Sequence, residues 1–178
     1  GFVMEGAVAS NSFFGAETGS TTTTGDENTG IGAKALYLNL TGTRNVAVGN
    51  NASYTNSTSN NNTAVGHNAL YTSTAADNVA MGYKALYANT TATEGVAIGS
   101  TTLQANTTGA KNTAVGFASM KRNTTGAGNT AVGNYTLQEN TTAANNTAIG
   151  QYSLYANTGA DNTAVGRNAL DANTTADN

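Results

Sequence analysis

The sequence contains no cysteine and no proline among its 178 residues, and few of its residues are charged. Without cysteine, the chain can form neither disulfide bridges nor thiolate metal sites. Charged residues make up 10% of the chain and the net charge is −3, so there is no basic region of the kind that binds nucleic acid or anionic lipid. No apolar run approaches the length of a transmembrane helix. These absences argue against nucleic-acid binding and against direct insertion of this segment into a membrane.

The most informative feature is a phrase, Asn-Thr-Ala-Val-Gly or a close variant, that returns every 16 or 17 residues. A fixed period of this length is typical of solenoid proteins. Phe2 stands where a Leu is expected and Asn178 where the next phrase should begin, so we expect a fragment of a longer array without its own capping coils. Residues 1–178 are predicted to form one array whose coils end at Gly15, Gly32, Gly49, Gly66, Gly82, Gly99, Gly116, Gly133, Gly150 and Gly166.

The residues before each glycine predict a short strand. Two large residues, the first usually Thr or Val, flank a small one, and this period-2 pattern of β-branched residues favours a strand. We expect both large residues to point into the coil. The predicted core therefore includes the residue directly before each glycine, at Val48, Val65, Ile98, Val115, Val132, Ile149 and Val165.

The residues after each glycine predict a second short strand, with the glycine as a sharp bend between the two. A Leu four positions after the glycine is expected in the core, at Leu36, Leu70, Leu86, Leu103, Leu137, Leu154 and Leu170. An Asn-Thr-Thr-Gly turn follows, which should absorb the missing residue of each 16-residue spacing. A second Asn column directly before the first strand can form an amide ladder. The predicted fold is all-β: a parallel β-solenoid of about ten 16–17-residue coils, with two short strands per coil.

So thin a coil suggests that one chain is not enough. Three inward side chains contribute roughly 6 kcal/mol per coil, whereas ordering 17 residues costs on the order of 25 kcal/mol. We therefore expect a side-by-side homo-oligomer, most simply a homotrimer. The columns of small residues have two interpretations. They either allow close approach between chains, which we favour, or they fit a narrow coil interior.

No arrangement of residues indicates catalysis. The only histidine, His67, lies in a variable column, and Asp77, Asp161 and Asp177 share a column that Arg44 and Lys111 interrupt. This mixture argues against a calcium ladder. We therefore expect no enzymatic activity, no catalytic residues, no metal and no cofactor. The predicted recognition surface is the tyrosine column Tyr37, Tyr54, Tyr71 and Tyr87, which could stack on sugars or anchor a protein. The alternative is that these rings cover the strand surface or pack between chains.

The repeat resembles a known family of fibrous proteins. Asn45-Val46-Ala47-Val48-Gly49 and, apart from its first residue, Gly95-Val96-Ala97-Ile98-Gly99 are similar to the Asn-x-Val-Ala-Ile-Gly phrase in the head repeats of trimeric autotransporter adhesins. The Asn-Thr-Ala-Val-Gly form also resembles shaft repeats of bacteriophage tail fibres and bacterial surface fibres. The resemblance implies a left-handed parallel β-roll and a trimer. The coil here is longer than in the adhesin heads, and Thr often stands where they have Val.

This resemblance leads to a functional hypothesis. The chain is predicted to be a structural or adhesive segment of an extracellular trimeric fibre, on a cell surface or a virion, with a host-surface protein or glycan as partner. The alternative is a monomeric, Thr-rich, ice-binding β-solenoid, because Thr recurs in regular columns. An enzyme such as a fibre-borne glycan depolymerase is disfavoured, because the sequence lacks a candidate catalytic set.

Overall fold

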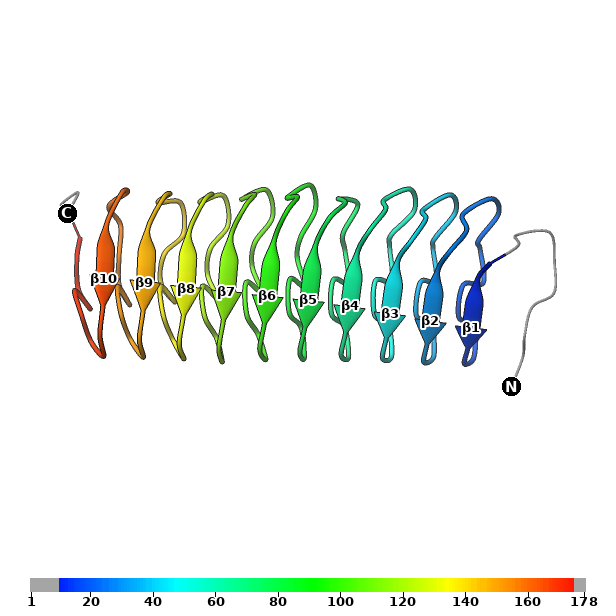
Figure 1. The fold of residues 1–178 in the computed structure, drawn as a ribbon, viewed down its shortest axis with the longest axis horizontal. Coiled ribbons are helices and arrows are strands. Elements are labelled where there is room, and N and C mark those ends of the chain that lie inside the picture. Colours follow the sequence, from blue (N-terminus) through cyan, green and yellow to red (C-terminus); the bar gives the residue numbers. More distant parts are fainter. Residues whose placement is uncertain (1–9, 175–178) are drawn as a thin grey trace.

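The computed structural model describes residues 10–174, which form an elongated all-β rod in which successive coils stack along the long axis (Figure 1). Within this range there is no helix, and ten parallel strands form one sheet in sequence order. The expectations for Phe2, Asp177 and Asn178 lie outside the described residues. The strands are β1 (Ser12–Phe14), β2 (Thr29–Ile31), β3 (Val46–Val48), β4 (Thr63–Val65), β5 (Val79–Met81), β6 (Val96–Ile98), β7 (Thr113–Val115), β8 (Thr130–Val132), β9 (Thr147–Ile149) and β10 (Thr163–Val165).

The register between neighbouring strands follows the repeat. Ala47 pairs with Ala64 across a 17-residue coil, and Ala64 pairs with Ala80 across a 16-residue coil. The shorter coil between β9 and β10 also keeps Ala148 opposite Ala164. As predicted, the turns absorb the missing residues, because a one-residue slip in a strand would move its side chains to the opposite face.

The direction of the strand side chains differs from the prediction. The middle residue of each strand points inward, so Ala47, Ala64 and Ala97 are fully buried. The large residues on either side point outward. The interior of the coil is too narrow for two large side chains per strand. Their proposed place in the core was therefore wrong for the single chain: Ile98, Val132, Ile149 and Val165 are exposed, and Val48, Val65 and Val115 are only partly buried.

The segment after each motif glycine also differs from the prediction. In the described residues each coil has a strand before the glycine, and the segment after it is not a strand. In the segment after Gly32, Lys34 and Leu36 have left-handed backbone, with φ of 57° and 52°. This alternation bends the chain where a strand would extend it. The segment still bonds to the next coil, because the amide nitrogens of Leu36 and Leu38 donate to the carbonyl oxygens of Ala52 and Tyr54 at 3.0 and 2.9 Å.

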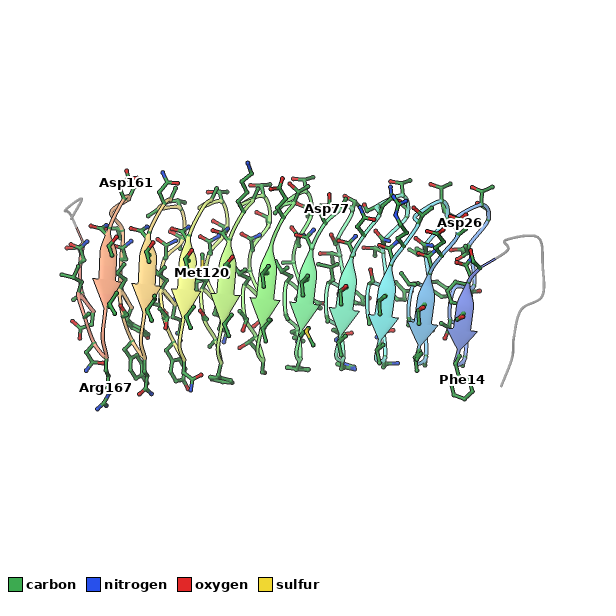
Figure 2. The ribbon with its side chains drawn as sticks, in the orientation of Figure 1. Phe14, Asp26, Asp77, Met120, Asp161 and Arg167 are labelled. Carbon is green, nitrogen blue, oxygen red and sulfur yellow. The ribbon has the colours of Figure 1, made fainter. Side chains whose placement is uncertain are left out.

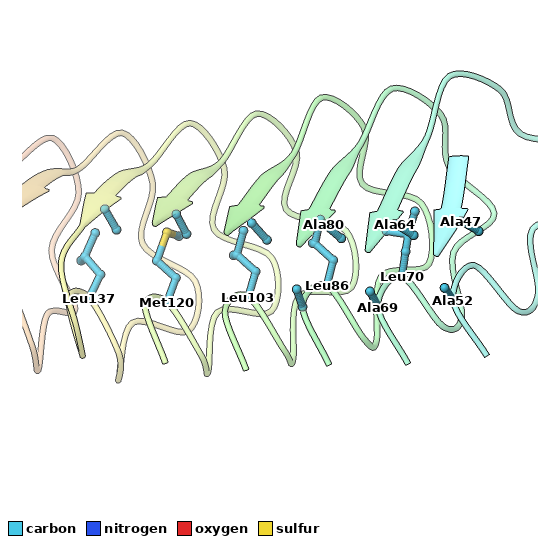
Figure 3. Close-up of a cluster of buried hydrophobic side chains, with 14 of the residues drawn as sticks. Ala47, Ala52, Ala64, Ala69, Leu70, Ala80, Leu86, Leu103, Met120 and Leu137 are labelled. Carbon is cyan, nitrogen blue, oxygen red and sulfur yellow. The ribbon is translucent and has the colours of Figure 1, made fainter. Parts of the chain in front are cut away.

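The apolar core is a single file of leucines facing the strand alanines (Figure 3). Six leucines are almost fully buried, and a seventh, Leu170 in the last described coil, is 42% exposed. The buried ones are Leu36, Leu70, Leu86, Leu103, Leu137 and Leu154. Met120 occupies the same column, whereas Ser53 breaks it with a buried hydroxyl that has no hydrogen-bond partner. The small column before the leucines also lies inside the coil, which supports the interpretation that small residues fit a narrow interior. They do not provide close approach between chains.

The motif glycines are required for two reasons. Gly116 has φ of 133°, a conformation that residues with a side chain rarely adopt. A Cβ on Gly116 would lie 2.4 Å from the carbonyl oxygen of Gly133 in the next coil. The motif glycines of neighbouring coils therefore stack backbone on backbone along the rod. The sharp bend predicted at each glycine is confirmed.

Two buried asparagine columns fill the polar part of the interior. In the column before the strand, the Asn28 Oδ1 accepts the amide of Asn45 at 2.9 Å, and Asn129 Oδ1 accepts that of Asn146 at 2.9 Å. In the turn column, Asn123 Nδ2 donates to Asn106 Oδ1 at 2.8 Å and to the carbonyl of Gly126 at 2.9 Å. Most coils are thus joined to the next by side-chain amides as well as by backbone bonds, which compensates for the thin apolar core.

The first described coil packs a phenylalanine into the interior where most other coils have a strand alanine and a leucine. Phe13 occupies the inward position that is alanine in most other strands, and its ring lies against the apolar core. Gly19 replaces the leucine, and a Cβ there would meet the Phe13 ring at 2.4 Å. Gly30 replaces the next strand alanine, where a Cβ would lie 3.0 Å from the same ring. Two glycines therefore make room for one large side chain.

Candidate functional site

Outward-facing apolar side chains form a stripe along the sheet side of the rod. We call the residues directly before the motif glycines the outer stripe: Ile31, Val48, Val65, Met81, Ile98, Val115, Val132, Ile149 and Val165. Ile31 is 44% exposed, Met81 40% and Ile149 41%. Because consecutive strands pair in parallel register, the stripe is continuous from β2 to β10. A long exposed apolar stripe of this kind is typical of an interaction surface.

A second outward row runs beside the outer stripe, two residues earlier in each strand. It contains Thr29, Thr63, Thr113, Thr130, Thr147 and Thr163, interrupted by Val46, Val79 and Val96. The sheet face is therefore mixed apolar and hydroxylated. It is also nearly free of charge, because neither row contains an ionisable residue.

The predicted recognition tyrosines form a continuous stack on the surface of the coil. The ring centroids of Tyr37 and Tyr54 are 5.0 Å apart, those of Tyr54 and Tyr71 5.0 Å, and those of Tyr71 and Tyr87 5.2 Å. Their planes differ by only 10° to 13°. We call these four residues the tyrosine ladder. All four are half-buried, which means that they belong to the surface and not to the core.

The stacking limits what the ladder can bind. Tyr54 and Tyr71 have a neighbouring ring against both faces, so neither can stack on a sugar. A lysine accompanies each end of the ladder. Lys34 Nζ lies 5.6 Å from the centroid of Tyr37, and Lys84 Nζ lies 5.3 Å from that of Tyr87, both within range of a cation–π interaction. The ladder therefore presents the edges of its rings, with their phenol groups, between two cations.

Aromatic residues outside the ladder extend the same surface, and the sequence analysis did not single them out. All eight tyrosines of the chain lie within five residues after a motif glycine, and none is buried. Tyr135 and Tyr152 stack at 5.0 Å, Tyr152 meets Tyr155 edge-on at 5.6 Å, and Tyr83 stacks on His67 at 5.8 Å. Tyr155 lies in the same column as the ladder, five residues after its glycine, whereas Tyr83, Tyr135 and Tyr152 lie one or two residues after theirs. Only the clustering of tyrosines shortly after the glycines could have indicated a shared surface.

Charged residues lie along both long edges of the rod, and the first of these edges carries both signs of charge. Asp26, Asp77 and Asp161 lie along one edge, and Arg167 and Phe14 along the other (Figure 2). On the first edge, the Asn61 side chain bridges Arg44 and Asp77. Its Oδ1 accepts a hydrogen bond from Arg44 Nε at 2.8 Å, and its Nδ2 donates to Asp77 at 2.9 Å. Among residues 10–174, no group of His, Asp or Glu side chains is placed to hold a metal ion.

The threonines of the turn act within the fold. The hydroxyls of Thr90, Thr107 and Thr124 each donate to a main-chain carbonyl of the next coil, at 2.9, 3.1 and 3.0 Å. This column therefore fastens coil to coil.

The chain was compared with known proteins, and no family model, curated protein or solved structure matches it. In the part that the structure describes, no helix is long and apolar enough to cross a membrane. The function is therefore inferred from the rod, the outer stripe and the aromatic surface.

Proposed function

We propose that this chain is a structural and adhesive segment of an extracellular, homotrimeric fibre, on a cell surface or a virion. The outer stripe is the observation that carries the proposal, because it is a continuous apolar surface on one side of a narrow rod. Three rods around a common axis would each turn this stripe inward. The resemblance of the repeat to adhesin heads and tail-fibre shafts supports three copies and an extracellular location.

The energetics favour association that grows with the length of the rod. Burying the exposed 39% of Ile98 would contribute about 1 kcal/mol, given roughly 2–3 kcal/mol for full burial of such a side chain. Nine positions of this kind contribute on the order of 9 kcal/mol per chain, before the second outward row is counted. Association costs about 4–15 kcal/mol. A few coils would therefore remain monomeric, whereas a longer array would assemble.

In this proposal the aromatic surface faces away from the common axis. Tyrosines supply large, rigid contact area with a polar tip, which suits protein or glycan partners. Repetition along the fibre would allow weak contacts to add by avidity. The chain would then act as a shaft that also presents binding surfaces. Nothing in this role requires catalysis.

The test of assembly is the solution mass of the chain and of two matched variants. Ile98→Asp places a charge on the outer stripe, and Thr108→Asp places the same charge on an exposed turn. We expect a trimeric mass for the parent chain and for Thr108→Asp, and a shift toward monomer for Ile98→Asp with little change in circular dichroism. A monomeric parent chain at high micromolar concentration would contradict the proposal.

The second candidate is a monomeric ice-binding solenoid. The observation in its favour is the outward strand face, where Thr113, Thr130 and Thr147 stand in consecutive strands beside apolar residues. Val46, Val79 and Val96 interrupt the same row, so the threonine face is not uniform. Thermal hysteresis of a monomeric chain, lost in Thr130→Lys, would favour this candidate over the fibre.

A further inference from the structure

We propose that the tyrosine ladder is a site of oxidative cross-linking, at which adjacent coils become joined by dityrosine bonds. The inference does not depend on the fibre function, because it concerns neighbouring rings within one chain. It rests on three properties of these rings: their spacing, their accessibility and the lack of easier electron donors in the chain.

The spacing brings the reacting rings together before oxidation. Tyr54 has Tyr37 on one side and Tyr71 on the other, with both centroids at 5.0 Å and nearly parallel planes. The carbonyl of Tyr71 accepts the Thr55 amide, so its backbone is also tied to the neighbouring coil. Reaction partners held this way need no diffusive encounter, which greatly raises their effective concentration.

Accessibility allows both the oxidant and the coupling motion. The ladder rings are half-buried on the surface of the coil, so a diffusing oxidant can reach their phenol edges. They are not part of the leucine and alanine core, and therefore a ring can rotate toward its neighbour without opening a cavity.

The composition directs oxidation to tyrosine. The chain has no cysteine and no tryptophan, the residues that would otherwise compete for one-electron oxidation. Met120 is fully buried, whereas Met81 is 40% exposed, and its oxidation to sulfoxide forms no cross-link. Two adjacent tyrosines are therefore the natural end point of a one-electron oxidation here.

The step balances with a peroxide-driven haem peroxidase as the oxidant. Each of two phenols gives up one electron and its hydroxyl proton, leaving unpaired spin on the ring carbons ortho to the oxygen-bearing carbon. The two radicals form one carbon–carbon bond between the rings. The hydrogen on each bonded carbon then moves to the phenol oxygen. In all, two electrons and two protons leave the tyrosines, and they reduce one hydrogen peroxide to two waters.

The expected products can be separated by trypsin. Cleavage after Lys34, Arg44, Lys84 and Lys111 places Tyr37 in peptide 35–44, Tyr54 and Tyr71 in peptide 45–84, and Tyr87 in peptide 85–111. A Tyr37–Tyr54 bond would thus join peptide 35–44 to 45–84, and a Tyr71–Tyr87 bond would join 45–84 to 85–111, whereas a Tyr54–Tyr71 bond stays within peptide 45–84. Tyr135 and Tyr152, stacked at 5.0 Å, are an independent second pair within peptide 123–167.

The experiment treats the purified 178-residue chain with peroxidase and hydrogen peroxide, and follows dityrosine fluorescence, intact mass and tryptic peptides. We expect a monomer-sized product that is lighter by two hydrogens per bond, together with the predicted peptide pairs. The double variant Tyr54→Phe and Tyr71→Phe keeps the stacked rings but leaves Tyr37 and Tyr87 apart. It should lose both peptide pairs but keep the Tyr135–Tyr152 bond, and its thermal unfolding midpoint should rise less after oxidation than that of the parent chain.

Tyr83→Phe is the matched control. Tyr83 is 47% exposed, and the aromatic ring stacked on it is His67 and not a tyrosine. If the ladder geometry directs the reaction, this variant forms the same bonds as the parent chain. The proposal is overturned if bonds through Tyr83 or between chains equal those within the ladder, if no dityrosine forms, or if urea-unfolded chain gives the same bonds in the same proportions.

Discussion

The asparagine column before the strands has one gap, at Gly95, and filling it should stabilise the rod. The preceding residue of the column, Asn78, accepts the Gly95 amide at 2.9 Å, as its equivalents do in other coils. Gly95 itself offers no side-chain acceptor to the amide of Asn112, which is fully buried. In Gly95→Asn, the new Oδ1 would accept this amide and the new Nδ2 would donate toward the turn of the next coil.

The magnitude follows from the missing bonds. A buried donor without its acceptor costs about 1–3 kcal/mol, and replacing a glycine at a compatible position stabilises by about 0.4–1 kcal/mol. Ordering the new side chain offsets part of this, on the order of 1 kcal/mol. A new Cβ would meet Asn78 Oδ1 at 2.9 Å, and that amide is the far end of a side chain. We expect a net gain of about 0.4–3 kcal/mol, or a thermal midpoint higher by on the order of 5 °C.

The assay compares Gly95→Asn with Gly95→Ala at equal protein concentration. The alanine variant has the backbone effect without the amide, so the difference between the two variants measures the restored bonds. Hydrogen exchange at the Asn112 amide supplies a local measurement, and it should slow in the asparagine variant alone. The reasoning is refuted if the two variants unfold at the same midpoint and the Asn112 amide exchanges equally fast in both.

Four further substitutions probe other columns by the midpoint of urea unfolding. Gly116→Ala should prevent folding of its coil, because the methyl group would contact the Gly133 carbonyl; a midpoint within experimental error of the parent would contradict the close stacking. Leu103→Ala should destabilise by about 2–5 kcal/mol as a core cavity forms, and a loss under 1 kcal/mol would contradict its burial. Ser53→Leu should stabilise by about 1–3 kcal/mol, by restoring the leucine file and removing an unpaired hydroxyl, and a lower midpoint would contradict the presence of room for the larger side chain. Lys111→Gly should stabilise slightly, by about 0.5–1 kcal/mol, because φ there is 60°; an unchanged or lower midpoint would contradict this reasoning.

Much of the architecture could be predicted because it depends on local patterns. The period fixed the coil length, and the pairing of Ala64 with Ala80 shows that the shortened turn left the strands in register. The glycine bend and the asparagine ladder followed from backbone conformation and amide chemistry. Each of these signals is contained within one repeat, and about ten copies of it were available.

Which strand side chains face the interior could not be predicted in the same way. Alternation shows that Val46 and Val48 share a face, but not that this face is the outer one. General hydrophobicity favours Val inside and Ala outside, and in this coil the narrow interior reverses that preference. The leucine segment was mistaken for a strand for a related reason: Leu36 at φ of 52° is a conformation that its side chain disfavours, and packing imposes it. The aromatic surface was found only in part, since Tyr83 and Tyr135 lie in variable columns.

The exchange of Phe13, Gly19 and Gly30 has a consequence for how such an array can change over generations. Most coils could be duplicated or deleted by recombination between repeats, because each presents the same contacts to its neighbours. A crossover between Phe13 and Gly30 would instead leave the bulky ring facing an alanine, or leave the glycines facing a void. This end of the described rod must therefore be inherited as a block, while the coils beyond it can vary in number.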